Sequence, residues 1–220
     1  MTNTNNTLDL TGIQVLLFDL DDTLYPRTNG VWEQIGRRIE RFLIEVMGFP
    51  AAEVPELRRR LWQQYGTTLR GLQAEYAVDM DAYLAYVHDV PLADLMPPDP
   101  ALARALATLP QPKFLFTNSD LAHTRRVTDQ LGVTAQFMGV VDIYAMFPHC
   151  KPEPEAFHKA LQICKGAPTE CLLIDDSPRN LETARALGMK TVSIGQFRHD
   201  GSPHFNDIRD CLATFKGDFG

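Results

Sequence analysis

Three aspartates stand within four positions near the start of the chain, directly after an apolar run. The run from Val15 to Phe18 is short and leads into Asp19, Asp21 and Asp22, which is typical of a buried strand with charge at its carboxyl end. In open α/β sheets, ligands bind in the crevice beyond that end. Carboxylates gathered in a crevice repel one another unless a proton or a cation joins them. Since Mg²⁺ prefers oxygen ligands, we expect it to bind here.

Further polar residues follow later in the chain, at the ends of apolar runs or just before a helix pattern. Thr117 and Asn118 stand at the end of an apolar run that begins at position 113. Lys151 precedes a helix pattern, and Asp175 and Asp176 stand at the end of an apolar run that begins at position 171. The carboxyl ends of parallel strands share one edge of a sheet, so these side chains are expected to lie near Asp19.

Together these residues could perform phosphoryl transfer. Asp19 would attack phosphorus in line and form an aspartyl-phosphate. Asp21, two positions further on, would protonate the leaving oxygen and later deprotonate the attacking water. General acid–base help of this kind contributes roughly 10²–10⁴-fold. Mg²⁺ would offset the repulsion between nucleophile and phosphate, and its expected ligands are Asp19, the carbonyl of Asp21, Asp175 and Asp176.

The remaining polar residues fit the binding of a phosphate group. Lys151 would stabilise the phosphate oxygens and keep Asp19 ionised. Thr117 offers a hydroxyl, and the backbone amides around Asn118, at a helix start, offer donors to an anion. Each also has a plain structural interpretation: Thr117 or the Asp175–Asp176 pair could cap helices, and Lys151 could be a solvated surface lysine. Their order and joint placement at strand ends favour catalysis.

The six histidines offer no second catalytic arrangement. His149 lies close to Lys151 in the sequence, but a carboxylate already fills the acid–base role, so we expect His149 to be a packing or surface residue. The other five histidines show no pairing with each other. The chain also lacks a Ser-His-Asp pattern, a P-loop and a GxGxxG motif.

Five short strand-like runs must position these residues: Val15–Leu20, Lys113–Thr117, Gly139–Ile143, Cys171–Asp175 and Lys190–Ile194. Helix patterns separate the later runs and begin at Ser119-Asp120, Pro152-Glu153-Pro154 and Ser177-Pro178. Strand and helix in alternation predict an α/β fold with a central parallel sheet between two layers of helices, as in a three-layer Rossmann-like core.

The stretch between the first two strand-like runs breaks this alternation. It shows helical stripes instead, the first running from Trp32 to Val46. We expect a small all-helical cap at residues 26–97, inserted after the first core strand and lying over the carboxyl edge of the sheet. The remaining divisions would be a flexible amino tail at 1–11 and a catalytic core at 12–25 and 98–220.

Composition excludes several kinds of partner. The net charge is −7 and there is no basic run, which argues against a nucleic-acid polymer or an anionic membrane as partner. The four cysteines form no CxxC pair and indicate buried free thiols in a reducing compartment. The amino end has no signal-peptide pattern, and no apolar stretch is long enough to cross a membrane. We therefore expect a cytoplasmic protein that acts on a small phosphorylated metabolite.

The four polar segments resemble the motifs of the haloacid dehalogenase (HAD) superfamily of aspartate-nucleophile phosphatases. They match in order, as Phe18–Leu24, Phe116–Asn118, Lys151-Pro152 and Ile174–Ser177. The resemblance covers nearly the whole chain past the amino tail. It implies a HAD core with a C1-type cap, Mg²⁺ as cofactor and hydrolysis through an aspartyl-phosphate. In the superfamily the residue aligned with Asp176 is the more dependable metal ligand, whereas that aligned with Asp175 binds directly or through water.

A narrower resemblance is to the pyrimidine 5′-nucleotidase branch. It rests on Asp21–Pro26, Tyr65–Leu72 and Asp175–Asn180, and it implies nucleoside 5′-monophosphates such as UMP and CMP as substrates. In the segment from Gly66 to Leu72, the expected substrate-reading residues are Thr68 and Arg70. The alternative is a helix–helix turn with glycine at each end.

Other interpretations stay open beside this one. A sugar-phosphate phosphatase or phosphomutase of the same superfamily shares the core and differs in the cap. A receiver-like phosphoacceptor switch also gathers Asp, Thr and Lys around Mg²⁺, but it is shorter and needs neither Asp21 nor a cap. A haloacid dehalogenase proper attacks carbon without Mg²⁺, so Asp21 and the Asp175–Asp176 pair argue against it. A catalytically silent binding protein is disfavoured because no catalytic position is replaced.

Overall fold

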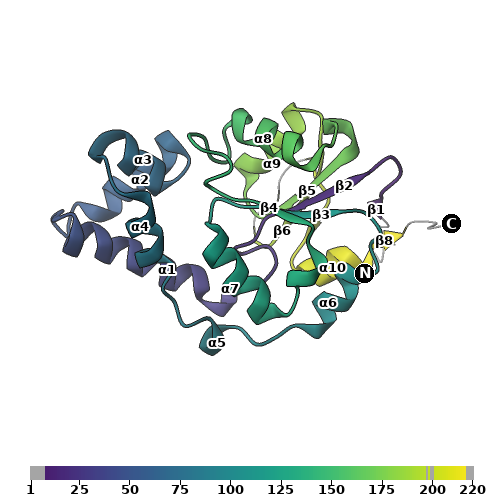
Figure 1. Ribbon diagram of the computed structural model, residues 1–220, viewed down its shortest axis with the longest axis horizontal. Coiled ribbons are helices and arrows are strands. Elements are labelled where there is room, and N and C mark those ends of the chain that lie inside the picture. The colour runs from purple at the N-terminus through teal and green to yellow at the C-terminus, as the bar shows by residue number, and fades with distance from the viewer. Residues whose placement is uncertain (1–7, 197, 199–200, 217–220) are drawn as a thin grey trace.

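A six-stranded parallel sheet runs through the larger part of the molecule (Figure 1). The computed structural model describes residues 8–196, 198 and 201–216. The strands lie in the order β4-β3-β2-β5-β6-β7, and their bounds are β2 Val15–Phe18, β3 Lys113–Phe116, β4 Gly139–Val141, β5 Cys171–Asp175, β6 Lys190–Ile194 and β7 His204–Phe205. The five predicted strands and the predicted parallel α/β core are confirmed, and β7 is added at one edge.

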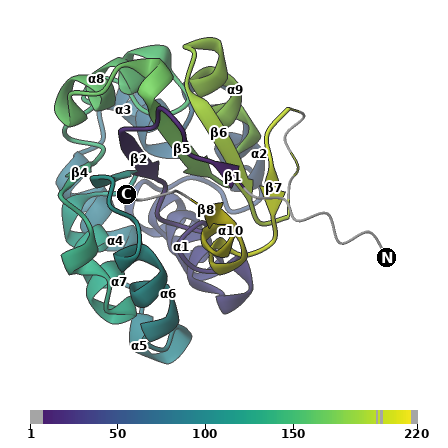
Figure 2. The same ribbon diagram turned by 90° about the vertical axis from the view of Figure 1, so that its right-hand side faces the viewer.

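Helices cover both faces of this sheet, which gives the three layers visible in Figures 1 and 2. Successive strand residues point to opposite faces. Leu16 and Phe18 of β2 therefore pack with α6 (Pro100–Ala107), α7 (Leu121–Leu131) and α10 (Ile208–Ala213). Val15 and Leu17 pack with α8 (Pro154–Cys164) and α9 (Pro178–Ala186). Because β2 is buried on both sides, its sequence is apolar without alternation.

The helices of the core begin and end near the residues that the sequence predicts. The side chain of Asp120 caps α7 by accepting from the backbone amide of His123, and α7 ends at Gly132, whose φ is +76°. A left-handed φ of this kind favours glycine after a helix. Ser177 stands at the N-cap position of α9, but its side chain makes no capping bond. Pro178 fixes the first turn there.

The segment predicted as a cap is helical, and it contains no strand among its residues, all of which are described. Its helices are α1 (Val31–Arg41), a π-helical turn at Phe42–Val46, α2 (Val54–Tyr65), α3 (Thr68–Tyr76), α4 (Met80–Val87) and the short α5 (Leu92–Leu95). Helices α1 to α4 gather on the left of Figure 1, beyond the carboxyl ends of the strands, and α5 lies at the bottom, on the connection that leads to α6. Most of the predicted apolar stripe is buried, but Trp32 and Val46 at its two ends are exposed.

Short 3₁₀ turns complete the connections, at Arg27–Asn29, Thr134–Gln136 and Pro168–Glu170. All four cysteines are free and buried, as the composition predicts. Among the described residues, no helix combines the length and the apolar character that spanning a membrane requires.

The described part of the amino tail belongs to the fold, which corrects the prediction of a flexible segment at 1–11. β1 (Leu8–Asp9) pairs in parallel with β8 (Phe215–Lys216). Leu8 and Leu10 are apolar and pack on the main core cluster, which gives the physical reason for the difference. Residues 1–7 lie outside the described residues.

Candidate active site

The carboxyl ends of three neighbouring strands form the base of the site. β2 is hydrogen-bonded between β3 and β5. Asp19 follows β2 directly, Thr117 follows β3, and Asp175 is the last residue of β5. The strand order changes direction at β2, and this switch point is where open α/β sheets bind ligands. The polar residues predicted at strand ends therefore lie at one edge.

Lys151 reaches this edge from the loop between β4 and α8. Its Nζ lies 2.8 Å from Asp19 Oδ1 and 2.8 Å from Asp175 Oδ2, and its side chain is 1% exposed. Burial acts to lower the pKa of Lys151, but the charges of Asp175 and Asp19 outweigh it and raise the pKa above its ordinary value. The ammonium group therefore stays charged between the two carboxylates.

Asn118 and Thr117 support the loop that carries Lys151. The Asn118 side chain accepts a hydrogen bond from Lys151 N and donates one to Lys151 O, at 2.9 Å each. Thr117 is buried, and its Oγ1 accepts from Ser119 N at 3.0 Å. Both side chains thus have protein partners in this structure, and the phosphate-binding role predicted for this segment stays a prediction.

The carboxylate of Asp175 is surrounded by donors, whereas that of Asp176 is not. Asp175 Oδ1 accepts from Ser177 N and Asn180 Nδ2, both at 2.9 Å, and its Oδ2 accepts from Lys151 Nζ. Asp175 is fully buried, and Asp176 is partly buried. Within the described part of the chain, no donor binds the Asp176 side chain. Both of its oxygens are therefore available to an added cation.

The charges at this edge fit a divalent cation. Ligand oxygens of Asp19, Asp175 and Asp176 lie within 4.8 Å of one another. Burial, helped by the charges of neighbouring carboxylates, raises the pKa of Asp176 to about 9. Burial also raises the pKa of Asp19 to about 7, against the opposing charge of Lys151. One ammonium does not balance three carboxylates, and a hard cation with oxygen ligands would relieve the excess.

Asp21 is held by a separate set of donors. Tyr25 donates to its Oδ1 at 2.5 Å, Ser119 donates to its Oδ2 at 2.6 Å, and His123 Nε2 lies 2.8 Å from Oδ1. Burial acts to raise the pKa of Asp21, but the charge of His123 and these hydrogen bonds hold it well below its ordinary value. The carboxylate of Asp21 does not belong to the cluster of Asp19, Asp175 and Asp176. The metal contact predicted for Asp21 concerns its backbone carbonyl oxygen instead.

His123 is a residue of the site that the sequence analysis missed. The expectation that the histidines do not pair is wrong, because the rings of His88 and His123 stack with centroids 4.2 Å apart. One signal was available in the sequence. Asp120 caps α7, which places His123 in the first helical turn, next to the segment of Thr117 and Asn118. The partner of His123 could not be read from the sequence, since it depends on the rotation of α7.

The cap lies directly on the loop of Lys151. A Cβ on Gly66, just before α3, would lie 3.0 Å from the carbonyl oxygen of Lys151 and 3.1 Å from Cys150 Sγ. Gly66 also has a φ of +83°, so glycine is required here for two reasons. From the core, Arg179 donates to the carbonyl oxygen of Trp62 at 3.2 Å and lies over the Trp62 ring.

Arg70 of α3 bridges the cap and the core. Its Nη2 donates to the carbonyl oxygens of Ile143 at 3.1 Å and His149 at 2.9 Å, and its guanidinium lies over the Phe147 ring. Its Nε is buried and has no partner among the described residues. Thr68 is the first residue of α3 and is partly buried. The substrate-reading role of Thr68 and Arg70 stays a prediction.

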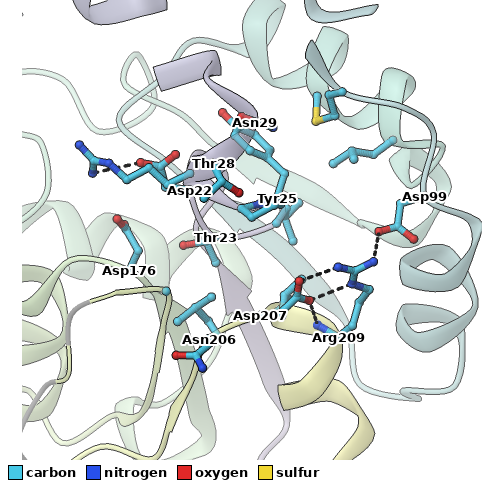
Figure 3. Close-up of a pocket in the computed structure, with 18 of the residues that line it drawn as sticks. Asp22, Thr23, Tyr25, Thr28, Asn29, Asp99, Asp176, Asn206, Asp207 and Arg209 are labelled. Carbon is cyan, nitrogen blue, oxygen red and sulfur yellow. Dashed lines mark hydrogen bonds and ion pairs between the residues drawn. The ribbon is translucent and has the colours of Figure 1, made fainter. Parts of the chain in front are cut away.

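A cavity of about 460 Å³ lies beside the carboxylate cluster (Figure 3). Asp22 and Asp176 line it on one side, and residues 96–99 and the start of α10 line it on the other. Asp22 is buried, has a φ of +61° and pairs with Arg27 at 3.3 Å. The cavity leaves room for water or a hydrated ion next to Asp176.

Comparison with known proteins gives consistent matches. A family model described as haloacid dehalogenase-like hydrolase matches residues 13–188. The chain is 30% identical to Phosphate metabolism protein 8 of Saccharomyces cerevisiae over 194 residues, which are 81% of this chain but only 60% of that protein. It is 22% identical to Phosphoglycolate phosphatase of Mesorhizobium japonicum over 188 residues, 82% of each. β-Phosphoglucomutase of Clostridium difficile has a similar fold, with a TM-score of 0.60 at 16% identity, covering 90% of this chain and 92% of that one.

The matched region begins before β2 and extends past the end of α9, so it contains the helical segment and every polar residue of the strand edge. The family model therefore covers the site described above, and the structural likeness shows the same fold. The chain belongs to the haloacid dehalogenase-like hydrolases.

Proposed function

We propose that this chain is a Mg²⁺-dependent phosphomonoester hydrolase that works through an aspartyl-phosphate on Asp19. One observation carries the proposal: the buried Lys151 contacts both Asp19 and Asp175, and the open carboxylate of Asp176 lies beside them. A nucleophile, a fixed cation and a set of metal-binding oxygens thus share one sheet edge. This is the arrangement that the transfer of an anionic group requires.

The residues divide the reaction into two steps. In the first, an oxygen of Asp19 forms a bond to phosphorus while the bond to the leaving oxygen breaks, and Asp21 gives its proton to that oxygen. In the second, Asp21 takes a proton from water, the water oxygen attacks phosphorus, and the bond to Asp19 breaks. Lys151 holds positive charge beside the phosphate throughout. When bound, Mg²⁺ would supply further positive charge to the phosphate oxygens.

Asp21 needs a proton for the first step, although its donors hold it ionised in this structure. An approaching phosphate dianion is a like charge, and a like charge nearby raises the pKa of a carboxyl group. Substrate binding would therefore favour the protonated form of Asp21. After the leaving group departs, the three donors would again favour the carboxylate, which is the form that deprotonates water.

The proposed substrates are nucleoside 5′-monophosphates, with UMP and CMP first. This choice is supported by the resemblance at Tyr65–Leu72. A small phosphate of another kind, such as a sugar phosphate, is the alternative, and the names of the phosphoglycolate phosphatase and β-phosphoglucomutase relatives favour it. The net charge of −7 disfavours a nucleic-acid polymer or an anionic membrane as partner.

The proposal is tested by phosphate release from UMP, CMP, dTMP, AMP, GMP and several sugar phosphates, with Mg²⁺ and with EDTA. We expect release that requires Mg²⁺ and favours the pyrimidine monophosphates. Release that favours sugar phosphates would keep the reaction and replace the substrate. Release that persists in EDTA would remove the metal from the proposal, and no release from any ester would reject a phosphomonoester hydrolase.

The nucleophile is tested by the variant Asp19→Asn, which should lose turnover while its circular dichroism spectrum stays that of the wild type. During turnover, borohydride should reduce the acyl phosphate of the wild type and leave homoserine at position 19, detectable by peptide mass. The control is Asp94→Asn, an exposed carboxylate of the short α5, which should keep full activity. An unmodified Asp19 under steady turnover would show that water attacks phosphorus directly.

A further inference from the structure

The carboxylate of Asp21 has one donor from its own loop, one from the loop after β3 and one from α7. Tyr25 lies four residues away in the same loop, and Ser119 follows β3. His123 comes from inside α7 and approaches Oδ1 to 2.8 Å through Nε2. An ionised carboxylate only accepts hydrogen bonds, so Nε2 carries the hydrogen in this contact. Oδ1 therefore has two donors, from Tyr25 and His123, and Oδ2 has one, from Ser119.

The ring of His123 is fixed on several sides. Its residue is 1% exposed, and its backbone amide donates to Asp120 Oδ1 at 2.6 Å. Its ring stacks on that of His88, with planes 20° apart. The Nδ1 of His88 lies 3.2 Å from the other oxygen, Asp120 Oδ2. One carboxylate thus holds the backbone of His123 and the ring packed against it, so His123 has little freedom to turn away from Asp21.

Among the described residues, Asp21 is the hydrogen-bond partner of the His123 ring. Within the described part of the chain, the buried Nδ1 of His123 has no partner. Buried polar atoms are usually paired, and an unpaired one asks for an explanation. If the residue served packing only, an apolar ring could fill the same space without burying an unpaired nitrogen. The ring therefore has a polar task at Nε2, and the atom it contacts is Oδ1 of Asp21.

We propose that His123, braced by His88, is a positioning residue that determines which oxygen of Asp21 exchanges the proton in the reaction. The inference rests on the proposed function. Two donors occupy Oδ1, so a proton on Asp21 must be carried by Oδ2, where the hydroxyl of Ser119 can turn and accept instead of donating. The proton then passes from Oδ2 to the leaving oxygen as its bond to phosphorus breaks, and it is recovered from water in the second step.

This role makes a prediction about leaving groups. An alkoxide, as from UMP, needs the proton to depart, whereas p-nitrophenolate departs without one. The value of kcat/KM reports the steps up to departure of the leaving group. In His123→Leu, kcat/KM for UMP, or for the alkyl phosphate that the wild type prefers, should fall by about tenfold or more, since acid catalysis contributes roughly 10²–10⁴-fold. For p-nitrophenyl phosphate it should change by less than about twofold.

Two amide variants separate positioning from packing, and they keep the test open if His123→Leu does not fold. In His123→Gln, the side-chain amide nitrogen lies near the place of Nε2 and can still donate to Asp21, so most of the alkyl phosphate activity should remain. In His123→Asn the amide is one methylene too short, and the selective loss should return. His158→Leu, at an exposed histidine of α8, is the matched control and should match the wild type. Thermal melting checks that each variant folds.

The outcomes decide between three explanations. Equal losses on both esters would show that His123 serves structure only, and no loss on either would remove it from the site. Equal behaviour of the Gln and Asn variants would also overturn the proposal. A wild-type protein that cleaves neither ester would instead reject the proposed function, and this inference with it.

Discussion

Lys151 is the residue on which the charge balance of the site depends. It is buried, and it contacts Asp19 and Asp175 at the same distance of 2.8 Å. A buried ion pair adds little stability compared with an apolar pair, but removing one partner leaves the other charges unpaired in a medium that solvates them poorly. We therefore expect the lysine to matter for stability as well as for its proposed role in binding phosphate.

The variant Lys151→Met should show both effects. Without metal, we expect the free energy of unfolding to fall by about 3–5 kcal/mol, the range seen when one partner of a buried ion pair is removed, as measured by urea denaturation. Phosphate release should be lost. Lys159→Met on the exposed face of α8 is the control and should change stability by less than about 0.5 kcal/mol. An unchanged midpoint for Lys151→Met would mean that the two carboxylates are protonated or solvated without it.

At the scale of elements, α3 is joined to the core by the side chain of Arg70 and by the close approach at Gly66. Gly66 precedes it, and Arg70 within it donates to carbonyl oxygens of Ile143 and His149, in the loop that leads to Lys151. The helix that carries the predicted substrate-reading residues is thus positioned by the same loop that carries Lys151. The position of α3 and the position of Lys151 are coupled through that loop.

The variant Arg70→Ala should change the order of preferred substrates more than the chemistry. We expect the ratio of kcat/KM between UMP and a sugar phosphate to change by about tenfold or more, since polar contacts of a buried group discriminate strongly. Arg70→Lys keeps the charge but cannot hold both carbonyl oxygens in the same way, so it should give an intermediate ratio. Activity equal to that of the wild type on every substrate would end the substrate-reading hypothesis for Arg70.

At the scale of the whole molecule, the excess of carboxylates at the sheet edge links pH, metal and stability. Burial raises the pKa of Asp176 to about 9 and that of Asp19 to about 7, above the ordinary value near 3.8 for an unfolded chain. The protonated forms therefore stabilise the metal-free fold fully below pH 4. This contribution is lost as the pH rises through 7 and 9, because the folded protein must then hold unbalanced charge.

Metal binding should reverse this loss. We expect the melting temperature without metal to decrease between pH 6 and pH 9, and the increase caused by Mg²⁺ to be larger at pH 8.5 than at pH 6, because protons compete with the cation. Asp176→Asn should show a weaker response to Mg²⁺ at both values. A shift by Mg²⁺ that is the same at both pH values would indicate binding elsewhere.

The elements that could be predicted are those with a strong local signal. Short apolar runs ending in charge locate β2 and β5, and the cap residue Asp120 with Gly132 bounds α7. The parallel order then places the polar strand ends together. The two-residue strands, such as β7 and β1, have no comparable signal, since their pairing depends on residues far away in the sequence.

The contacts that could not be predicted join distant segments through the rotation of a helix. His123 meets Asp21 across 102 positions, and Arg70 meets His149 across 79. A few tens of degrees of rotation in α7 or α3 would separate each pair, and no pattern in one sequence determines such an angle. Asp19 and Lys151 are also far apart, but strand order and the motif resemblance place them together.

The contact at Gly66 has a consequence for the exchange of caps between relatives. The cap touches the Lys151 loop at a point where a methyl group would lie 3.0 Å from a carbonyl oxygen. A helical segment transplanted from another protein would have to bring a glycine to this point, or else the loop that carries the lysine would be displaced. The core on which the helical segment is placed thus restricts the residue type at Gly66.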